Sequence, residues 1–166
     1  MASVKMLDAL NGQLNKEMFS SYLYLSMAVY FEDQNLNGMA NWMKLQSQEE
    51  YEHGMKFYEY IMQVGGKVKL LQIDEPADNW DSAQAAFEGA LEHEKFISKS
   101  INDLADIAMS EKDHATVNFL AWFVTEQVEE EATALQIIED FKLIGDNKSG
   151  IYMLDRELGS RQASAE

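Results

Sequence analysis

Apolar residues recur at three- and four-residue steps along four long stretches of the chain. This spacing places them on one face of a helix, so the pattern predicts four amphipathic helices with a shared core. We place these helices at residues 4–33, 36–64, 82–110 and 114–144. A weaker apolar face formed by Ile151, Leu154 and Leu158 predicts a short fifth helix at residues 148–159.

The lengths of the connections predict how the helices are arranged. The first and last pairs are each joined by a short turn, so the helices within each pair should be antiparallel. The connection between the second and third helices has about 17 residues and could reach about 55 Å. A helix of about 28 residues is only about 42 Å long. The sequence therefore predicts an all-α four-helix bundle with one long crossover between helices 2 and 3, followed by a short C-terminal fifth helix.

Local signals predict where several helices begin and end. We expect Asn35 and Asp113 to be N-caps of the second and fourth helices, because short polar side chains accept hydrogen bonds from the first turn. Gly65 should end the second helix, and Asp81 or Ser82 should begin the third. These signals and the overall length predict a single domain over residues 1–166.

Composition narrows the function classes. The net charge of −16 disfavours nucleic acid and anionic membrane surfaces as partners, although it is also typical of an ordinary acidic protein. The chain has no cysteine, which excludes disulfides, thiolate metal sites and cysteine nucleophiles. No apolar run approaches the roughly 18 residues of a membrane span, and the N-terminus lacks the apolar run of a signal peptide. We therefore expect a cytoplasmic protein.

Polar residues interrupt the apolar face of each long helix near its midpoint. They are, in chain order, Glu17, Glu50, His53, Glu94, Gln127 and Glu130. In a bundle of four similar helices, interruptions at the midpoints meet at one height. Buried carboxylates at one height repel one another unless cations neutralise them. The pattern therefore predicts a buried site for a pair of metal ions.

Each of these elements is weak evidence when taken alone. A lone Glu-x-x-His, such as Glu50 and His53, is more often a surface hydrogen bond than a metal site, and a lone glutamate can extend its carboxylate to solvent. Their coincidence on four helices is the stronger observation. Single glutamates combined with Glu-x-x-His pairs are the ligand pattern of di-iron carboxylate proteins built in helical bundles.

A second acidic set lies beside the first in the sequence. Glu49, Glu126 and Glu129 neighbour the buried positions, and the last two lie on one helical face with Glu130. Two interpretations of this set remain open. It is either a third, more exposed metal position or an acidic surface that is only solvated. Tyr24, two turns beyond Glu17, is either a core tyrosine or a hydrogen-bonding or electron-donating neighbour of the metals.

The sequence also suggests a position or a role for three further side chains. We expect His93 and His114 to lie at the surface, because His93 is one residue away from the Glu94 face and His114 begins a helix. Trp122 is close enough in sequence to the fourth-helix ligands to be an oxidisable neighbour, although packing is the commoner role of a tryptophan.

These residues resemble the non-haem ferritin family of bacteria and archaea over essentially the whole chain. The matching positions, in order, are Glu17, Tyr24, Glu49, Glu50, Tyr51, Glu52, His53, Glu94, Glu126, Gln127, Val128, Glu129 and Glu130. The resemblance implies a ferritin-like bundle with two irons. By that likeness, the first iron is held by Glu17, Glu50 and His53, and the second by Glu50, Glu94 and Glu130.

The same resemblance implies further roles. Gln127 would hydrogen bond near the second iron, and the third iron site would be formed by Glu49, Glu126, Glu129 and Glu130. Haem-binding bacterioferritins carry methionine at the position of Tyr51, so we expect no haem here. Their second motif is Glu-x-x-His, whereas this chain has Gln127 and Glu130. The site therefore has one histidine, which favours iron passing through the second position.

The resemblance implies a ferroxidase that stores iron. It would oxidise Fe(II) with O2 or H2O2 at a centre within each subunit and deposit Fe(III) mineral inside a 24-subunit cage of identical chains. Two alternatives remain at this stage. One is a peroxide-reducing di-iron enzyme without storage, and the other is a structural bundle without metal.

Overall fold

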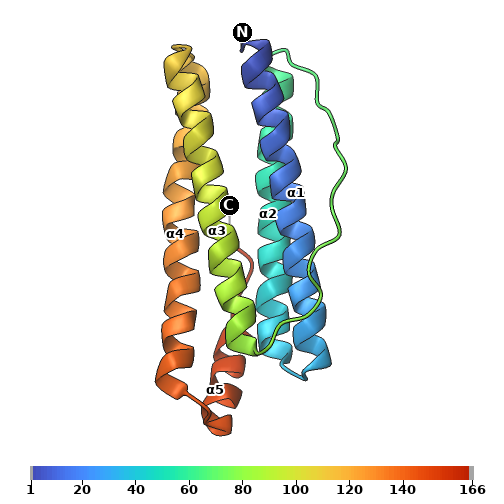
Figure 1. The fold of residues 1–166 in the computed structure, drawn as a ribbon, viewed down its shortest axis with the longest axis vertical. Helices are drawn as coiled ribbons and strands as arrows, with labels where there is room; N and C mark the ends of the chain where they lie inside the picture. Colours follow the sequence, from blue (N-terminus) through green and yellow to red (C-terminus); the bar gives the residue numbers. More distant parts are fainter. Residues whose placement is uncertain (1, 165–166) are drawn as a thin grey trace.

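The computed structural model describes residues 2–164, which form a bundle of long helices with a short helix at one end (Figure 1). The helices are α1 (Val4–Asp33), α2 (Asn37–Gln63), α3 (Ala83–Ser110), α4 (His114–Ile144) and α5 (Lys148–Leu158). This arrangement confirms the predicted all-α four-helix bundle with a short fifth helix. Within residues 2–164, no helix is both long and apolar enough to cross a membrane.

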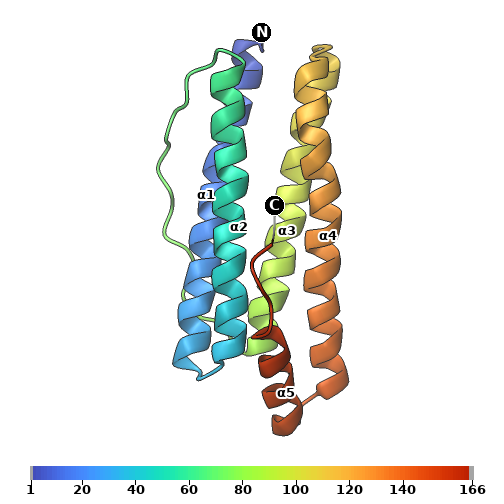
Figure 2. The same cartoon turned by 180° about the vertical axis from the view of Figure 1, so that it is seen from behind.

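The crossover runs the full length of the bundle, so α2 and α3 are parallel as predicted (Figures 1 and 2). It lies against α1, where two asparagine side chains hold its backbone. Asn11 donates to the carbonyl of Lys67 (3.1 Å) and accepts from the N–H of Lys69 (2.6 Å). One turn further along α1, Asn15 donates to the carbonyl of Gln72 (3.0 Å). These bonds satisfy backbone groups of a segment that has no secondary structure of its own.

Three of the predicted helix boundaries are confirmed. Ser82 caps α3 by accepting from the N–H of Ala85 (3.0 Å), and Asp113 caps α4 by accepting from the N–H of Thr116 (3.1 Å). Gly65 follows α2 with a φ of 77°, a left-handed conformation that favours glycine. The chain can therefore leave α2 sharply and enter the crossover.

The prediction that Asn35 caps α2 is wrong. Asn35 adopts a φ of 58° and belongs to the end of α1, where its N–H donates to the carbonyl of Glu32 (3.0 Å). The residue before α2 is Leu36, which has no side chain able to cap. The acceptor comes instead from α5, because Asp155 Oδ1 lies 2.8 Å from the N–H of Met39. A carboxylate at this position also interacts favourably with the helix dipole.

Two apolar clusters fill the bundle, one towards each end. Phe31, Phe87 and Phe141 are buried in the cluster at the α5 end, and Phe57 and Phe123 in the other. Burying each such side chain contributes about 1.5–3 kcal/mol relative to exposure. All six midpoint polar residues fall between the two clusters along their helices, so a polar layer divides the core.

Candidate metal centre

The polar layer contains two groups of residues able to hold a metal ion. Glu17, Glu50 and His53 form one group, and Glu50, Glu94 and Glu130 form the other. Within each group, one potential ligand atom per residue lies within 4.8 Å of the others. All five side chains are buried, with at most 9% of any residue exposed. Because Glu50 belongs to both groups, its two oxygens can serve adjacent cations.

Glu17 shows that the site is built for a further ligand. Gln13 donates to Oε1 of Glu17 (2.7 Å), whereas Oε2 is the one buried side-chain oxygen within residues 2–164 that has no hydrogen-bond partner. An orphaned buried carboxylate oxygen is costly unless it is protonated or binds a cation. The amide oxygen of Gln13 accepts from Ser100 (2.6 Å), which accepts from the ammonium of Lys16 (2.5 Å). These contacts orient Gln13 and hence Glu17.

A second glutamine holds the carboxylates on the opposite side of the centre. The amide nitrogen of Gln46 donates to Glu50 Oε1 and to Glu130 Oε2, both at 2.9 Å. Its oxygen accepts from Nη1 of Arg161 (3.0 Å), which determines which end of the amide faces the carboxylates. His53 Nδ1 lies 3.4 Å from Glu50 Oε2, so the imidazole is in position to share a cation with Glu50.

Glu94 is held by the two side chains that the sequence singled out beside the ligands. The hydroxyl of Tyr24 donates to Glu94 Oε1, and the amide of Gln127 donates to Oε2 (2.9 Å) and to the Glu94 carbonyl (3.2 Å). Both side chains therefore orient a metal-capable carboxylate. Trp122 packs edge-on against His53, with ring centroids 5.3 Å apart.

Burial makes these carboxyl groups reluctant to ionise. It raises the pKa of Glu17 and Glu50 well above the usual range, and the neighbouring charges of Glu50 and Glu94, respectively, raise them further. Burial, followed by the charges of Glu50 and Glu94, raises the pKa of Glu130 to about 9. Burial also raises the pKa of Glu94. A cation that binds here must displace protons, and its charge then favours the ionised carboxylates.

The second acidic set opens onto a surface pocket of about 340 Å³ beside the buried layer. Glu49, Glu126, Glu129 and Glu130 all contribute to its walls. Glu126 also forms a third metal-capable group with His53 and Glu130, again with ligand atoms within 4.8 Å of one another. The structure thus brings the predicted third set together, next to the second buried group.

Glu49 differs from the rest of this set because the end of the chain already engages it. Nη2 of Arg161 lies 2.6 Å from Glu49 Oε2. Within the described part of the chain, Glu49 belongs to none of the three metal-capable groups. The pocket is therefore acidic on the α4 side and paired with a cation on the α2 side.

The surface role predicted for His93 is wrong. Its Nε2 lies 2.7 Å from the hydroxyl of Ser20, and its ring packs at 6.0 Å from that of Tyr24. Burial lowers the pKa of His93 to about 4, so its imidazole is neutral at physiological pH. His114 is exposed at the start of α4, as predicted.

Sequence reasoning missed Gln13, Gln46 and Arg161. Each glutamine lies four residues before a buried glutamate, a spacing that allows a hydrogen bond on a helix. That signal is not selective, because Gln136 makes the same bond to Asp140 at the surface (3.0 Å). No local pattern marks Arg161, which is 112 residues from Glu49.

The fold and the site define the class of protein. Four helices with one long crossover, and a central layer in which a shared glutamate joins two carboxylate-rich groups, are the architecture of ferritin-like di-iron carboxylate proteins.

Comparisons with known proteins give the same class. Residues 7–144 match the model of the ferritin-like domain. The chain is 47% identical to a bacterial non-heme ferritin of Bacteroides fragilis, over 97% of this chain and all of that one. It is 38% identical to one from Campylobacter jejuni, over 94% and 93% of the two chains. An open-pore ferritin from the archaeon Archaeoglobus fulgidus superposes with a TM-score of 0.97 at 52% identity, covering 98% of this chain and 99% of that one.

The chain belongs to the ferritin family and is of the non-haem bacterial and archaeal type. In a member of this family, buried carboxylate and histidine groups able to hold a metal support iron storage as the function.

Proposed function

We propose that the chain is a ferroxidase that oxidises Fe(II) for storage. Two Fe(II) ions each lose one electron, and O2 takes up two electrons and two protons to give H2O2. With H2O2 as the oxidant, two electrons and two protons give two water molecules. The observation that carries the proposal is the pair of buried groups sharing Glu50, with an oxygen of Glu17 that has no hydrogen-bond partner.

The first position would be formed by Glu17, Glu50 and His53. Anionic carboxylate oxygens stabilise Fe(III) more than Fe(II), so these ligands make oxidation more favourable. The imidazole of His53 suits Fe(II) before oxidation. Gln13 supports this role because it holds one oxygen of Glu17 and leaves the other available.

The second position would be formed by Glu50, Glu94 and Glu130, with Tyr24 and Gln127 as hydrogen-bond donors to Glu94. It has no histidine of its own, so we expect it to hold iron less firmly than the first. Glu130 also belongs to the group with Glu126 and His53. This shared ligand supports a route by which Fe(III) leaves the second position.

The outward part of that route would pass Glu126, Glu129 and Glu49, which line the acidic pocket. Because these side chains are more exposed than the buried groups, they can bind and release an ion at a lower desolvation cost. We propose that they form the third iron site together with Glu130 and that this site is a point of transit.

Proton release should accompany Fe(II) binding. The raised pKa values of Glu17, Glu50 and Glu130 mean that these groups hold protons until a cation arrives. Those protons are released within reach of the oxidant, which consumes two. Tyr24 keeps its proton, because burial and then the charge of Glu94 raise its pKa well above the usual range.

Storage requires self-association, and we propose a cage of 24 identical subunits. One surface feature supports association. An apolar pocket of about 310 Å³ lies between α1, α2 and the crossover, lined by residues that include Leu70, Leu71 and Tyr51. Leu70 is 79% exposed in the single chain, and exposed apolar patches commonly mark interaction surfaces.

Light scattering after size exclusion tests the assembly. A cage of 24 chains has a mass of about 450 kDa, which is 24 times the 18.9 kDa of one chain. A monomer or dimer at micromolar concentration would rule out storage inside a cage while leaving the ferroxidase proposal open.

Stopped-flow absorbance after addition of Fe(II) tests the chemistry. We expect rapid oxidation in the native chain and an initial rate at least about tenfold lower in Glu50→Gln, since Glu50 belongs to both positions. Glu88→Gln, at an exposed position on α3, is the matched control and should oxidise iron at the native rate.

The alternatives predict other outcomes of the same experiment. Faster reaction with H2O2 than with O2, without mineral formation, would indicate a peroxide-reducing enzyme. A structural bundle would take up no iron and would keep its full thermal stability after chelation.

A further inference from the structure

The end of the chain covers the acidic pocket. After α5, residues 159–164, here called the tail, turn back and run beside α2 (Figure 2). Nη2 of Arg161 lies 2.6 Å from Glu49 Oε2, and the hydroxyl of Ser164 donates to Glu49 Oε1 at 2.6 Å. Both oxygens of Glu49 are therefore engaged by the tail. The ion pair is largely shielded from solvent, with 21% of the Arg161 side chain and 16% of the Glu49 side chain exposed.

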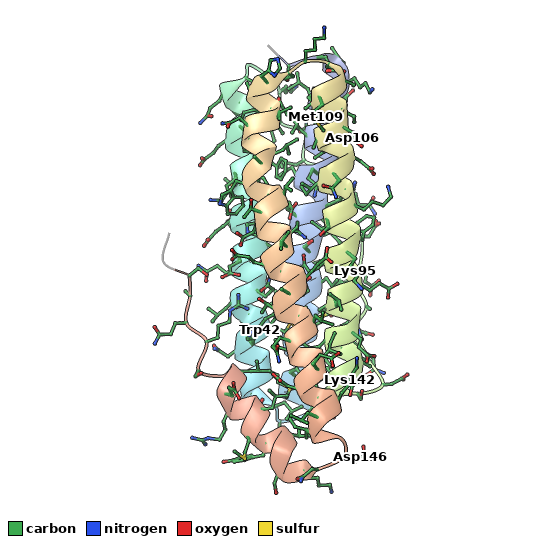
Figure 3. All side chains as sticks on the ribbon, turned by 90° about the vertical axis from the view of Figure 1, so that its left-hand side faces the viewer. Trp42, Lys95, Asp106, Met109, Lys142 and Asp146 are labelled. Carbon is green, nitrogen blue, oxygen red and sulfur yellow. The ribbon has the colours of Figure 1, made fainter. Side chains whose placement is uncertain are left out.

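Several contacts of different kinds fix the guanidinium of Arg161. Its central carbon lies 4.4 Å from the ring centre of Trp42, on the face of α2 that the tail passes (Figure 3). Nη1 lies 3.4 Å from the Trp42 carbonyl and 3.0 Å from Gln46 Oε1. A planar guanidinium can serve Glu49 and Gln46 at once because its donors point in fixed, divergent directions.

These contacts connect the tail to the buried layer. Arg161 engages the oxygen of the Gln46 amide, so the amide nitrogen faces the centre. That nitrogen donates to both Glu50 and Glu130 at 2.9 Å. Without Arg161, the amide could turn and present either end to the carboxylates. The position of the tail is therefore linked to the orientation of two proposed ligands of the second iron.

We propose that Arg161 is a positioning residue that holds the tail on the third metal position. Its contact with Glu49 is here called the latch. Arg161 supplies the positive charge at Glu49 until a metal ion replaces it, so that tail docking and metal binding at Glu49 exclude each other. Release of the latch frees the Gln46 amide and loosens its hold on Glu50 and Glu130. The idea rests on the proposed function only in placing Glu49 on the route of iron.

The latch has a consequence for the order of filling. While Arg161 neutralises Glu49, the pocket is less attractive to cations than its carboxylate count suggests. The buried groups around Glu50 therefore fill first. An ion that moves outward from the second position then displaces the tail.

Calorimetric titration of the full-length protein with La(III) tests the competition. La(III) is redox-inert and prefers oxygen ligands, so it reports binding without iron chemistry. The binding step that Glu49→Gln removes identifies the third position. We expect Arg161→Gln to raise the affinity of that step about tenfold, since it removes a competing charge-assisted bond. Equal affinity in the native and Arg161→Gln proteins would overturn the latch.

Two variants separate the latch from a general change of charge. Arg156→Gln removes one positive charge from the exposed face of α5, where Arg156 contacts Tyr152, and should leave the affinity within about twofold. Arg161→Lys keeps the charge but not the planar guanidinium, so it should retain only part of the native competition at Glu49 and give an affinity between those of the native and Arg161→Gln proteins. If Arg156→Gln raised the La(III) affinity as much as Arg161→Gln does, net charge alone would explain the increase.

Spin labelling tests the movement of the tail. Because the chain has no cysteine, Gln162→Cys creates a single labelling position in the tail. We expect the nitroxide spectrum to change from restricted to mobile as La(III) saturates the third position. In a protein that also carries Arg161→Gln, the spectrum should be mobile before any La(III) is added. A restricted spectrum at saturation would overturn the mutual exclusion.

Neither measurement depends on iron oxidation. Arg161-dependent La(III) binding in a protein that fails to oxidise Fe(II) would support the latch and reject the ferroxidase. Rapid oxidation of Fe(II), together with a La(III) affinity that is the same with and without Arg161, would support the ferroxidase and reject the latch.

Discussion

At the scale of single residues, two buried glutamines orient the carboxylates of the centre. Gln13 and Gln46 each donate an amide N–H to a glutamate four residues later in the chain. Ser100 and Arg161 engage their oxygens, so neither amide can flip without losing hydrogen bonds on both sides. Such partners hold metal-capable side chains in place before the metal arrives.

Replacement of Gln13 tests this orientation. Gln13→Leu keeps the volume but removes the donor to Glu17, so we expect affinity for Co(II) at the first position to fall about tenfold. Titration of the Co(II) absorbance measures the change. Gln136→Leu removes a similar bond at the surface and should have no effect. Native affinity in Gln13→Leu would show that Glu17 is held by packing alone.

Replacement of Tyr24 tests the second position separately. Tyr24→Phe removes the hydroxyl that donates to Glu94 and leaves a buried carboxylate oxygen with one partner fewer. We expect the weaker Co(II) binding step to lose about tenfold in affinity, while the step that depends on His53 is unchanged. A loss confined to the stronger step would contradict the assignment of Glu94 to the second position.

At the scale of elements, α5 is docked by a close backbone approach to the start of α2. Gly38 has no side chain, and a Cβ there would lie 1.7 Å from the carbonyl oxygen of Asp155. Asp155 in turn accepts from the N–H of Met39. Leu154 and Leu158 bury the apolar face of α5 against the end of the bundle. The docking of α5 also fixes where the tail begins.

Gly38→Ala should therefore loosen α5. We expect the free energy of unfolding to fall by about 1–3 kcal/mol, the usual cost of overpacking, and amide exchange in α5 to accelerate. Thermal unfolding followed by circular dichroism, together with hydrogen exchange, measures both effects. Gly12→Ala is the control, since a Cβ there meets nothing within 4 Å. It should stabilise the protein by about 0.5–1 kcal/mol.

At the scale of the whole molecule, the polar layer lowers stability until cations bind. The carboxyl groups of Glu17, Glu50, Glu94 and Glu130 have raised pKa values in the folded state. Between the unfolded pKa of about 4.5 and the folded value of about 9 for Glu130, the folded state binds more protons than the unfolded state. Stability is therefore greatest at low pH in this window and falls as pH rises.

We expect the metal-free protein to lose stability from pH 5 to pH 9, by up to about 1.4 kcal/mol per pH unit for each group that holds its proton only when folded. Thermal unfolding across this range measures the slope. Saturation with Zn(II) should flatten it, because the bound cation keeps the carboxylates ionised. Glu130→Gln should make the slope shallower, whereas the exposed Glu88→Gln should not change it. A stability that rises with pH above about pH 7, where His93 is neutral in both states, would contradict the raised pKa values.

The helices, their arrangement and the buried polar layer were all predictable from the sequence. Helical periodicity is local, so Phe87 and Ile101 identify the buried face of α3 and Glu94 stands out on it. The two wrong predictions also came from local patterns. His93 seemed exposed because it lies beside that face, yet its side chain is partly buried and hydrogen bonds to Ser20 on a neighbouring helix. Asn35 has the residue type of an N-cap but occupies the turn that ends α1.

The sequence by itself determined which residues share the buried layer, because the heights at which helical faces meet follow from spacing along each helix. Only the tertiary structure decided which donors reach that layer. Asp155 caps a helix 116 residues away, Ser100 supports Gln13 across 87 residues, and Arg161 reaches Glu49 across 112. The contacts of Asp155 and Arg161 depend on how α5 and the tail fold back onto the bundle, and that of Ser100 depends on how α3 packs against α1. No local pattern encodes that packing.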